Sequence, residues 1–168
     1  MGWRQRAFAL TVLVLLGCGK ETPTAFRDEA MGVAGVFPGS PVAVRYAEPS
    51  PYGSLEWFSR AWRPQFRANE NFQIEVTNLP PGTQGGTTPG EVLNTYQRWL
   101  QQRFGTVEWT ASPGEAQYRL HTANGLGLQG RVIVRRGRLH RAEATGPMGK
   151  AGFDTRAQAF LQSFQVNP

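Results

Sequence analysis

The sequence predicts an α+β fold in which an antiparallel β-sheet is flanked by two main helices. Phe72, Ile74 and Val76 alternate with polar residues, which is the pattern of a strand with one buried face. Four further strand-like runs between residues 106 and 145 are separated by short turns that contain glycine, as in an antiparallel meander. One amphipathic helix precedes these runs and another follows them. The order of strands, helix, strands and helix therefore predicts helices packed on a sheet.

Proline and glycine divide the first part of the domain into short strands. We expect a strand on either side of the segment that contains Pro38 and Gly39, because these residues interrupt regular structure. A loop with Pro49 and Pro51 then precedes a strand that is rich in aromatic residues. The expected strands cover residues 31–36, 42–46, 54–62 and 71–77.

The first helix has recognisable signals at both ends. Thr88 is a natural N-cap, Pro89 fits the first helical position, and Glu91 completes a capping box with Thr88. Gly105 marks the C-terminal end of the helix. The apolar residues between these signals have helical spacing, which we interpret as core packing and not as a cofactor site. They are Val92, Leu93, Tyr96, Trp99 and Leu100.

The second half of the chain continues with the four strand-like runs and a closing helix. The runs cover residues 106–111, 116–123, 128–135 and 138–145. Asp154 is the expected N-cap of the second helix. The apolar face of that helix is formed by residues at helical spacing, namely Ala157, Phe160, Leu161 and Phe164.

An apolar run near the start of the chain ends at Cys18, the only cysteine of the sequence. The run covers residues 7–16 and follows Arg4 and Arg6. It is shorter than the roughly 20 apolar residues that cross a bilayer core, so it is typical of a cleaved export signal. The motif at residues 15–18, Leu-Leu-Gly-Cys, resembles the lipobox of a bacterial lipoprotein.

This resemblance implies a lipid anchor on Cys18. Bacterial lipoproteins carry a diacylglyceryl thioether on this cysteine and an acylated amino terminus, and more than one acyl chain gives stable membrane anchoring. The alternative for Cys18 is a buried thiol or an intermolecular disulfide. We expect a cleaved signal peptide over residues 1–17, a lipidated flexible tether over 18–30 and a single domain over 31–168. Gly19 is not an acidic retention signal, which favours the outer membrane over the inner membrane.

Composition and charge bound the class of protein and its partners. Apolar residues make up 40% of the chain, with five Trp and ten Phe, so the sequence is not that of a disordered protein. Removal of Arg4 and Arg6 with the signal peptide would lower the net charge from +6 to +4. A mildly basic domain attracts anionic surfaces. We do not expect nucleic acid as a partner, because an exported lipoprotein rarely meets it.

Motifs along most of the mature chain resemble those of PsbP-like domains. The first half carries Phe37-Pro38-Gly39-x-Pro41, Phe72-x-Ile74-x-Val76, Pro80-Pro81-Gly82 and the helix at residues 91–103. The second half carries residues 131–134, Gly137-Arg138-Leu139, residues 144–147 and Phe160-Leu161-x-Ser163-Phe164. The resemblance implies an α/β/α sandwich that serves as a binding or assembly module. His140 is a departure, since members of this group commonly have Tyr after the Gly-Arg-Leu turn.

The sequence contains no recognisable catalytic or metal motif. His121 and His140 are the only histidines, and their spacing does not place two ligands together. We expect His140 to be partly buried, because it shares strand parity with Ala142 and Ala144. The run Gly125-x-Gly127-x-x-Gly130 matches a dinucleotide fingerprint by letter but lies between strands, with no helix after it. We therefore expect no cofactor and no metal.

One basic patch stands out in the hairpin expected near residue 136. Its arginines either keep a solvated hairpin soluble and protect an edge, or contact an anionic partner. Guanidinium groups suit phosphate and carboxylate, so head groups or an anionic envelope polymer would be the partner. The candidate polyanion-binding residues are Arg131, Arg135, Arg136, Arg138 and Arg141.

Two functions from different classes remain open at this point. The favoured hypothesis is a non-enzymatic, membrane-tethered binding or assembly module of the cell envelope, whose partner is an envelope protein or an anionic polymer. The alternative is a hydrolase-like envelope enzyme assembled from scattered polar residues such as Glu75, His121 and Glu143. A deep pocket that gathers these side chains would favour the enzyme.

Overall fold

The computed structural model describes residues 22–64, 67, 69–84, 87–122 and 125–167. The expected signal peptide and the lipobox with Cys18 lie outside the described residues. Among the described residues, no helix has the length and apolar character needed to cross a membrane.

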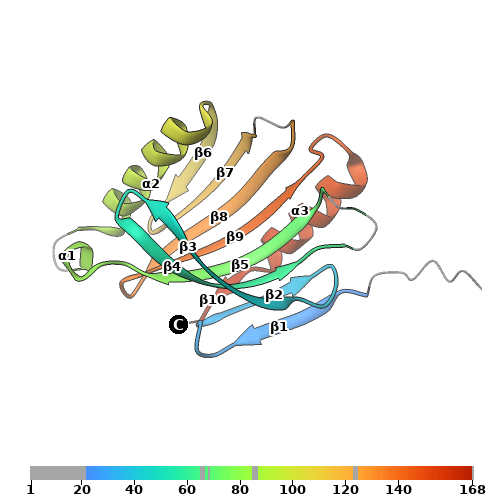
Figure 1. The fold of residues 1–168 in the computed structure, drawn as a ribbon, viewed down its shortest axis with the longest axis horizontal. Coiled ribbons are helices and arrows are strands. Elements are labelled where there is room, and N and C mark those ends of the chain that lie inside the picture. The colour runs from blue at the N-terminus through green and yellow to red at the C-terminus, as the bar shows by residue number, and fades with distance from the viewer. Residues whose placement is uncertain (1–21, 65–66, 68, 85–86, 123–124, 168) are drawn as a thin grey trace, which may run out of the picture.

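The centre of the molecule is a seven-stranded antiparallel sheet with the strand order β3-β4-β5-β9-β8-β7-β6 (Figure 1). Its N-terminal strands are β3 (Val42–Ser50), β4 (Gly53–Trp62) and β5 (Asn71–Asn78). The C-terminal strands are β6 (Val107–Ser112), β7 (Glu115–His121), β8 (Gly127–Arg135) and β9 (Arg138–Gly146). The two groups meet where β5 pairs with β9. Antiparallel pairing confirms the predicted strands, although β3 and β4 extend into the expected loop at residues 48–53.

A second sheet of three strands, in the order β1-β2-β10, was not expected. It consists of β1 (Thr24–Asp28), β2 (Val33–Phe37) and β10 (Gln165–Val166). The Phe26 ring packs edge-on against the Phe37 ring at 5.7 Å between centroids, which gives β1 a share in the core. The prediction of a flexible tether over residues 18–30 is therefore wrong for residues 24–28, which form a strand of the domain that was expected to start only at residue 31.

Three helices accompany the sheets: α1 (Pro81–Gln84), α2 (Pro89–Phe104) and α3 (Ala151–Ser163). The predicted capping box of α2 is confirmed, because the Thr88 side chain accepts a hydrogen bond from the Glu91 backbone and the Glu91 side chain accepts one from the Thr88 backbone. Asp154 is not the N-cap of α3. The helix begins four residues after Pro147, and Asp154 lies in its first turn, where its carboxylate accepts a hydrogen bond from the Gly149 backbone N–H at 3.0 Å.

The large sheet carries a separate hydrophobic core on each face. On one face α2 packs against β6, β7 and β8, with Leu93, Tyr96 and Tyr118 in the core. On the other face α3 packs against β2, β8 and β9, with Phe72 and Phe160 in the core. This arrangement confirms an α+β fold built mainly on antiparallel sheet. The small sheet shares the second face with α3, so that face is not covered by a helix alone.

Candidate anion-binding site

The site begins at the two-residue turn between β8 and β9, where Arg135 pairs with Arg138. The turn residues Arg136 and Gly137 have φ values of 51° and 68°, and a type I′ hairpin turn requires positive φ at both positions. Asn or Gly normally occupies the first position, because the left-handed backbone conformation there costs most other residues about 1 kcal/mol. Within the described ranges, Arg136 is the one non-glycine residue with a positive φ. An arginine is thus held at the hairpin tip against the local backbone preference.

The arginines of this tip line a hollow of about 370 Å³ beside the turn that joins β1 to β2. The wall is formed by the hairpin, by residues of the β1–β2 turn and by the segment that follows α3. The lining residues are Glu29, Met31, Gly32, Arg135, Arg136, Arg138, His140, Val166 and Asn167. Segments from both ends of the domain therefore meet the β8–β9 tip at this point.

His140 lies in the wall of this hollow and is only 3% exposed. Burial lowers the pKa of His140 to about 4, and the positive charges of Arg138 and Arg135 act in the same direction. A hydrogen bond between the ring and the Arg135 backbone partly opposes this shift. The imidazole is therefore neutral at pH 7. The prediction of a partly buried histidine understated its burial.

Two buried polar atoms that belong to residues lining the hollow have no hydrogen-bond partner. They are Nδ1 of His140 and Nδ2 of Asn167. Buried polar atoms in proteins are almost always hydrogen-bonded, so two orphans beside one hollow need an explanation. The amide nitrogen of Asn167 is a hydrogen-bond donor, and Nδ1 of His140 becomes a donor when the ring is protonated.

Charge in the hollow is predominantly positive. Arg138 Nη1 donates to the Ala30 carbonyl at 3.1 Å, and Arg135 Nη1 donates to the Val166 carbonyl at 3.5 Å, so backbone groups hold both guanidinium groups in place. The one carboxylate among the lining residues is that of Glu29, which pairs with Arg27 at 2.5 Å. Three arginines thus line a hollow whose single carboxylate already has a cationic partner.

Of the five arginines that the sequence analysis grouped, the structure brings three together. Arg131 lies on β8, as Arg135 does, but its contacts stabilise the fold. Its side chain pairs with Glu115 at 2.6 Å and donates to the Leu161 and Phe164 carbonyls at the end of α3. Arg141 is on the opposite face of the sheet and is buried. Arg131 and Arg141 are therefore not part of the candidate site.

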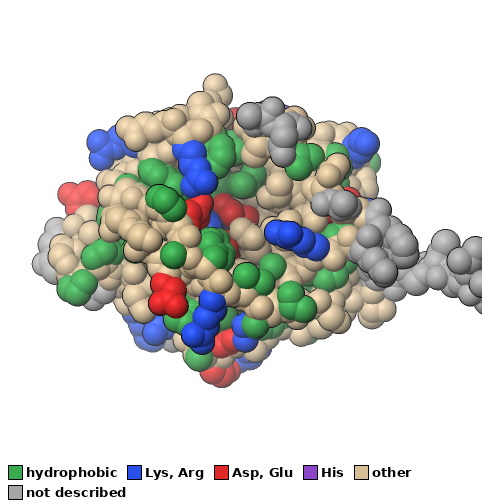
Figure 2. All heavy atoms as spheres, viewed as in Figure 1, with side chains coloured by type: hydrophobic (Ala, Val, Ile, Leu, Met, Phe, Trp, Pro, Cys, Tyr) green, Lys and Arg blue, Asp and Glu red, His purple; other side chains and the backbone are tan. Residues whose placement is uncertain are grey.

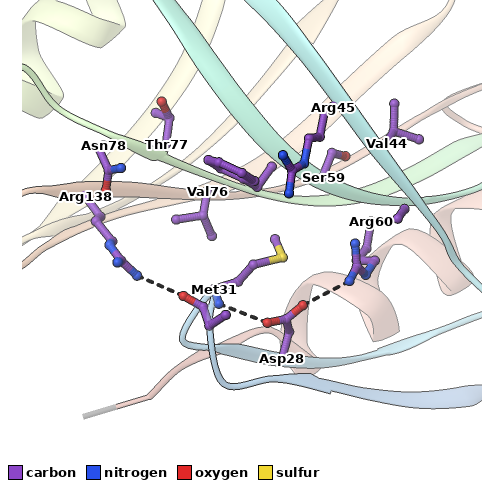
Figure 3. Close-up of a pocket in the computed structure, with 13 residues that line it drawn as sticks. Asp28, Met31, Val44, Arg45, Ser59, Arg60, Val76, Thr77, Asn78 and Arg138 are labelled. Carbon is purple, nitrogen blue, oxygen red and sulfur yellow. Dashed lines mark hydrogen bonds and ion pairs between the residues drawn. The ribbon is translucent and has the colours of Figure 1, made fainter.

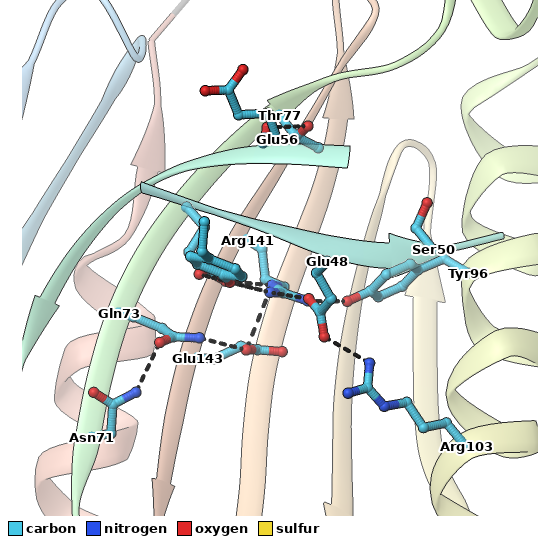
Figure 4. A network of polar contacts seen from close by, with 12 residues as sticks. Glu48, Ser50, Glu56, Asn71, Gln73, Thr77, Tyr96, Arg103, Arg141 and Glu143 are labelled. Carbon is cyan, nitrogen blue, oxygen red and sulfur yellow. Dashed lines mark hydrogen bonds and ion pairs between the residues drawn. The ribbon is translucent and has the colours of Figure 1, made fainter. Parts of the chain in front are cut away.

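Arg141 is the centre of a buried polar network on the α2 face (Figure 4). Its Nε donates to Glu75 at 2.6 Å and its Nη1 donates to the Tyr96 hydroxyl at 2.8 Å. The guanidinium carbon lies 4.2 Å from the centroid of the Trp57 ring, in a cation–π contact. Tyr46 donates to Glu75, and Tyr118 donates to Glu143, so both carboxylates are held inside the fold.

This network bears on the alternative of an enzyme built from Glu75, Glu143 and His121. Both glutamates contact Arg141, with Glu143 at 3.5 Å from its Nε. Burial raises the pKa of Glu75, while the charge of Arg141 opposes the shift. His121 is exposed near the end of β7 and alternates with Ala116, Tyr118 and Leu120, which are buried under α2. It therefore lies on the other face of the sheet, and the three residues do not meet.

A larger hollow of about 580 Å³ lies between the β1–β2 turn and strands β3 to β5 (Figure 3). Asp28 pairs with Arg60 at 3.1 Å across it, and the Arg45 guanidinium lies over the Phe58 ring at 4.8 Å. Arg138 and Met31 line both this hollow and the basic one, so the two adjoin at the hairpin tip. On the face shown in Figure 2, by contrast, acidic and basic side chains are interspersed over a largely uncharged surface.

Among the described residues, no group of three or more His, Cys, Asp and Glu side chains is arranged to hold a metal ion. The concentration of guanidinium groups at the hairpin tip suits an anion instead.

Comparison with known proteins bears on the fold. No protein-family model and no curated protein sequence matches the chain. Among solved structures, it is similar to the solution structure of the cyanobacterial PsbP protein (CyanoP) from Synechocystis sp. PCC 6803, with a TM-score of 0.50 and 17% sequence identity. The match covers 89% of this chain and 95% of the cyanobacterial one. At this level of identity the similarity concerns the fold alone, and the domain of this chain is PsbP-like in fold.

Proposed function

We propose that this chain is a lipid-anchored protein of the bacterial cell envelope that works as a non-enzymatic binding module for an anionic partner. The observation that carries the proposal is the hollow at the β8–β9 tip, which Arg135, Arg136 and Arg138 line together with the buried His140. Guanidinium groups bind phosphate and carboxylate oxygens through paired hydrogen bonds, and several together attract an anionic surface over a longer range.

Support for the anchor comes from the lipobox-like motif that ends at Cys18. The first described strand begins at Thr24, and the six residue steps from Cys18 to Thr24 can span at most about 20 Å. A domain tethered so closely would remain beside the membrane surface. Gly19 favours the outer membrane as that surface.

Support for a binding role without catalysis comes from the environment of the polar residues. Glu75 and Glu143 are buried and committed to Arg141 and to tyrosine hydroxyls. Neither glutamate lines the basic hollow or the larger one beside it. His121, which would be the natural base, lies on the other face of the sheet.

Membrane fractionation tests the anchor. The full chain is expressed in a bacterial host that processes lipoproteins, next to its Cys18→Ser variant, and the two are compared in washed membranes and in the soluble fraction. The wild-type chain is expected in the membranes and the variant in the soluble fraction. A variant that still sediments with the membranes would overturn the anchor.

Sedimentation with anionic vesicles or an anionic polymer tests the binding role. The unlipidated Cys18→Ser chain is compared with a version that also carries Arg135→Ala and Arg136→Ala. A control carries Arg98→Ala and Arg119→Ala, which remove the same charge from exposed positions on α2 and β7. We expect binding that weakens with salt and is lost only in the hairpin variant. Equal binding by all three proteins would contradict the proposal.

A further inference from the structure

Two unpartnered polar atoms beside the basic hollow point to a more specific ligand. We infer that the hollow takes a phosphate-type oxyanion group and that binding is coupled to uptake of one proton by His140. The inference rests on the proposed binding function and adds both the chemistry of the ligand and its dependence on pH. It is carried by the positions of His140 and Asn167, whose buried Nδ1 and Nδ2 atoms lack partners.

The first step concerns the donors around the hollow. Arg135 and Arg138 come from the two strands of the hairpin, and Arg136 comes from its turn. The three arginines therefore line the hollow from two strands and a turn, and several donors around one hollow suit a group with several acceptor oxygens, such as phosphate. The Asn167 amide would supply a further donor from the segment that follows α3.

The second step concerns the charge state of His140. The charged residues that line the hollow together with His140 are the arginines of the hairpin and Glu29 from the β1–β2 turn, and Asn167 lines it from the C-terminal segment. A neutral ring that uses one N–H toward the Arg135 backbone leaves Nδ1 as a bare acceptor. An oxyanion beside a bare acceptor would be repelled, whereas a protonated Nδ1 would donate to it.

The third step links proton and ligand. Without an anion, burial and the charges of Arg138 and Arg135 hold the pKa of His140 near 4. A bound oxyanion would offset those charges and would offer Nδ1 an acceptor, and both effects favour the imidazolium form. Because linkage is reciprocal, an anion that raises the pKa of His140 must itself bind more tightly as the pH falls.

NMR titration of the histidine rings tests the coupling directly. The unlipidated Cys18→Ser chain is titrated with and without sulfate, which mimics phosphate and keeps its charge throughout. His140 and His121 are the only two histidines, so the exposed His121 serves as an internal control. We expect sulfate to raise the pKa of His140 and leave that of His121 unchanged. The affinity for sulfate should rise up to about tenfold for each unit of that shift as the pH falls.

Variants test anion binding and its dependence on pH separately. Arg135→Ala with Arg136→Ala should abolish sulfate binding, while Arg98→Ala should leave it intact. His140→Gln should bind sulfate with an affinity that no longer depends on pH. A wild-type affinity that is constant between pH 5 and pH 7 would overturn the coupling, even if the anion binds.

Parallel ligands distinguish the source of the oxyanion and separate this inference from the proposed function. Inorganic phosphate, glycerophosphate and vesicles of phosphatidylglycerol are tested with the same chain. Binding of all three supports the inference, with the tightest of them indicating whether a free phosphate or a lipid head group is preferred. Binding of vesicles alone would overturn the inference and leave the proposed function standing. Failure of every anion, including the polymer, would overturn both.

Discussion

Arg141 donates a hydrogen bond from Nε to the Glu75 carboxylate at 2.6 Å, and the side chains of both residues are at most 5% exposed. They lie on β9 and β5, the neighbouring strands whose pairing joins the two halves of the sheet. Ion pairs withdrawn from water lose hydration, so such a pair persists only where further hydrogen bonds satisfy it. Tyr46 and Tyr96 provide those bonds here.

Arg141→Met should destabilise the protein by about 3–5 kcal/mol, because it leaves two buried carboxylates without their shared cation. Urea unfolding of both proteins measures the loss. The loss should be smaller at pH 5 than at pH 8. Burial raises the pKa of Glu75, so without Arg141 the folded chain holds a proton on this carboxylate that the unfolded chain releases, and stability falls as pH rises. Arg98→Met, on the exposed face of α2, is the control and should change stability by less than about 0.5 kcal/mol. A comparable effect of both variants would contradict a stabilising role for the network.

The low pKa of His140 predicts a loss of stability in mild acid. The unfolded chain takes up this proton near the ordinary histidine pKa of 6.5, whereas the folded chain takes it up only near a pKa of about 4. The free energy of unfolding should therefore fall by about 2 kcal/mol between pH 7 and pH 5 through this residue alone. Urea unfolding of His140→Gln should show a correspondingly shallower pH dependence. Parallel pH profiles for the two proteins would mean that His140 is not held neutral.

Local patterns accounted for most of the large sheet and for α2. The alternation in β5 and the capping box at Thr88 involve residues a few positions apart, so a short window of sequence contains the whole signal. The strand β1 was missed because Thr24–Asp28 contains only two apolar residues. Its strand conformation depends on pairing with β2, and β2 is in turn closed on its other side by the distant β10.

The candidate site was predictable only in part. Clustering of arginine around residue 136 pointed to the correct hairpin. Strand parity could also have separated Arg141 from the others, because Arg138 and His140 share one face of β9 and Arg141 lies on the opposite one. No short-range pattern, however, indicates that the β1–β2 turn and Asn167 complete the hollow. The β1–β2 turn lies more than a hundred positions from the hairpin, and Asn167 lies on the far side of α3 from it in the sequence.

Arg131→Ala should lower stability without weakening anion binding. Its guanidinium group pairs with Glu115 and accounts for two hydrogen bonds to carbonyls at the C-terminal end of α3. Loss of these contacts is expected to cost about 1–3 kcal/mol. Thermal unfolding and sulfate titration of the same sample measure the two properties. Arg135→Ala should give the reverse pattern, with little change in stability and weaker binding. Weakened sulfate binding by a folded Arg131→Ala protein would mean that Arg131 is part of the anion-binding site.

Arg136→Asn should raise stability and weaken anion binding in the same protein. Asparagine adopts the left-handed conformation of the first turn position more readily than arginine, so the variant relieves strain at φ 51°. The expected gain is about 0.5–1 kcal/mol, measured by urea unfolding in the absence of anions. The variant also removes one of the three guanidinium groups of the hollow, so its affinity for sulfate should fall. Arg136→Lys is the matched control, because it keeps both the charge and the strain. If Arg136→Asn gains stability and binds sulfate as tightly as the wild type, the arginine at this strained position does not serve the site.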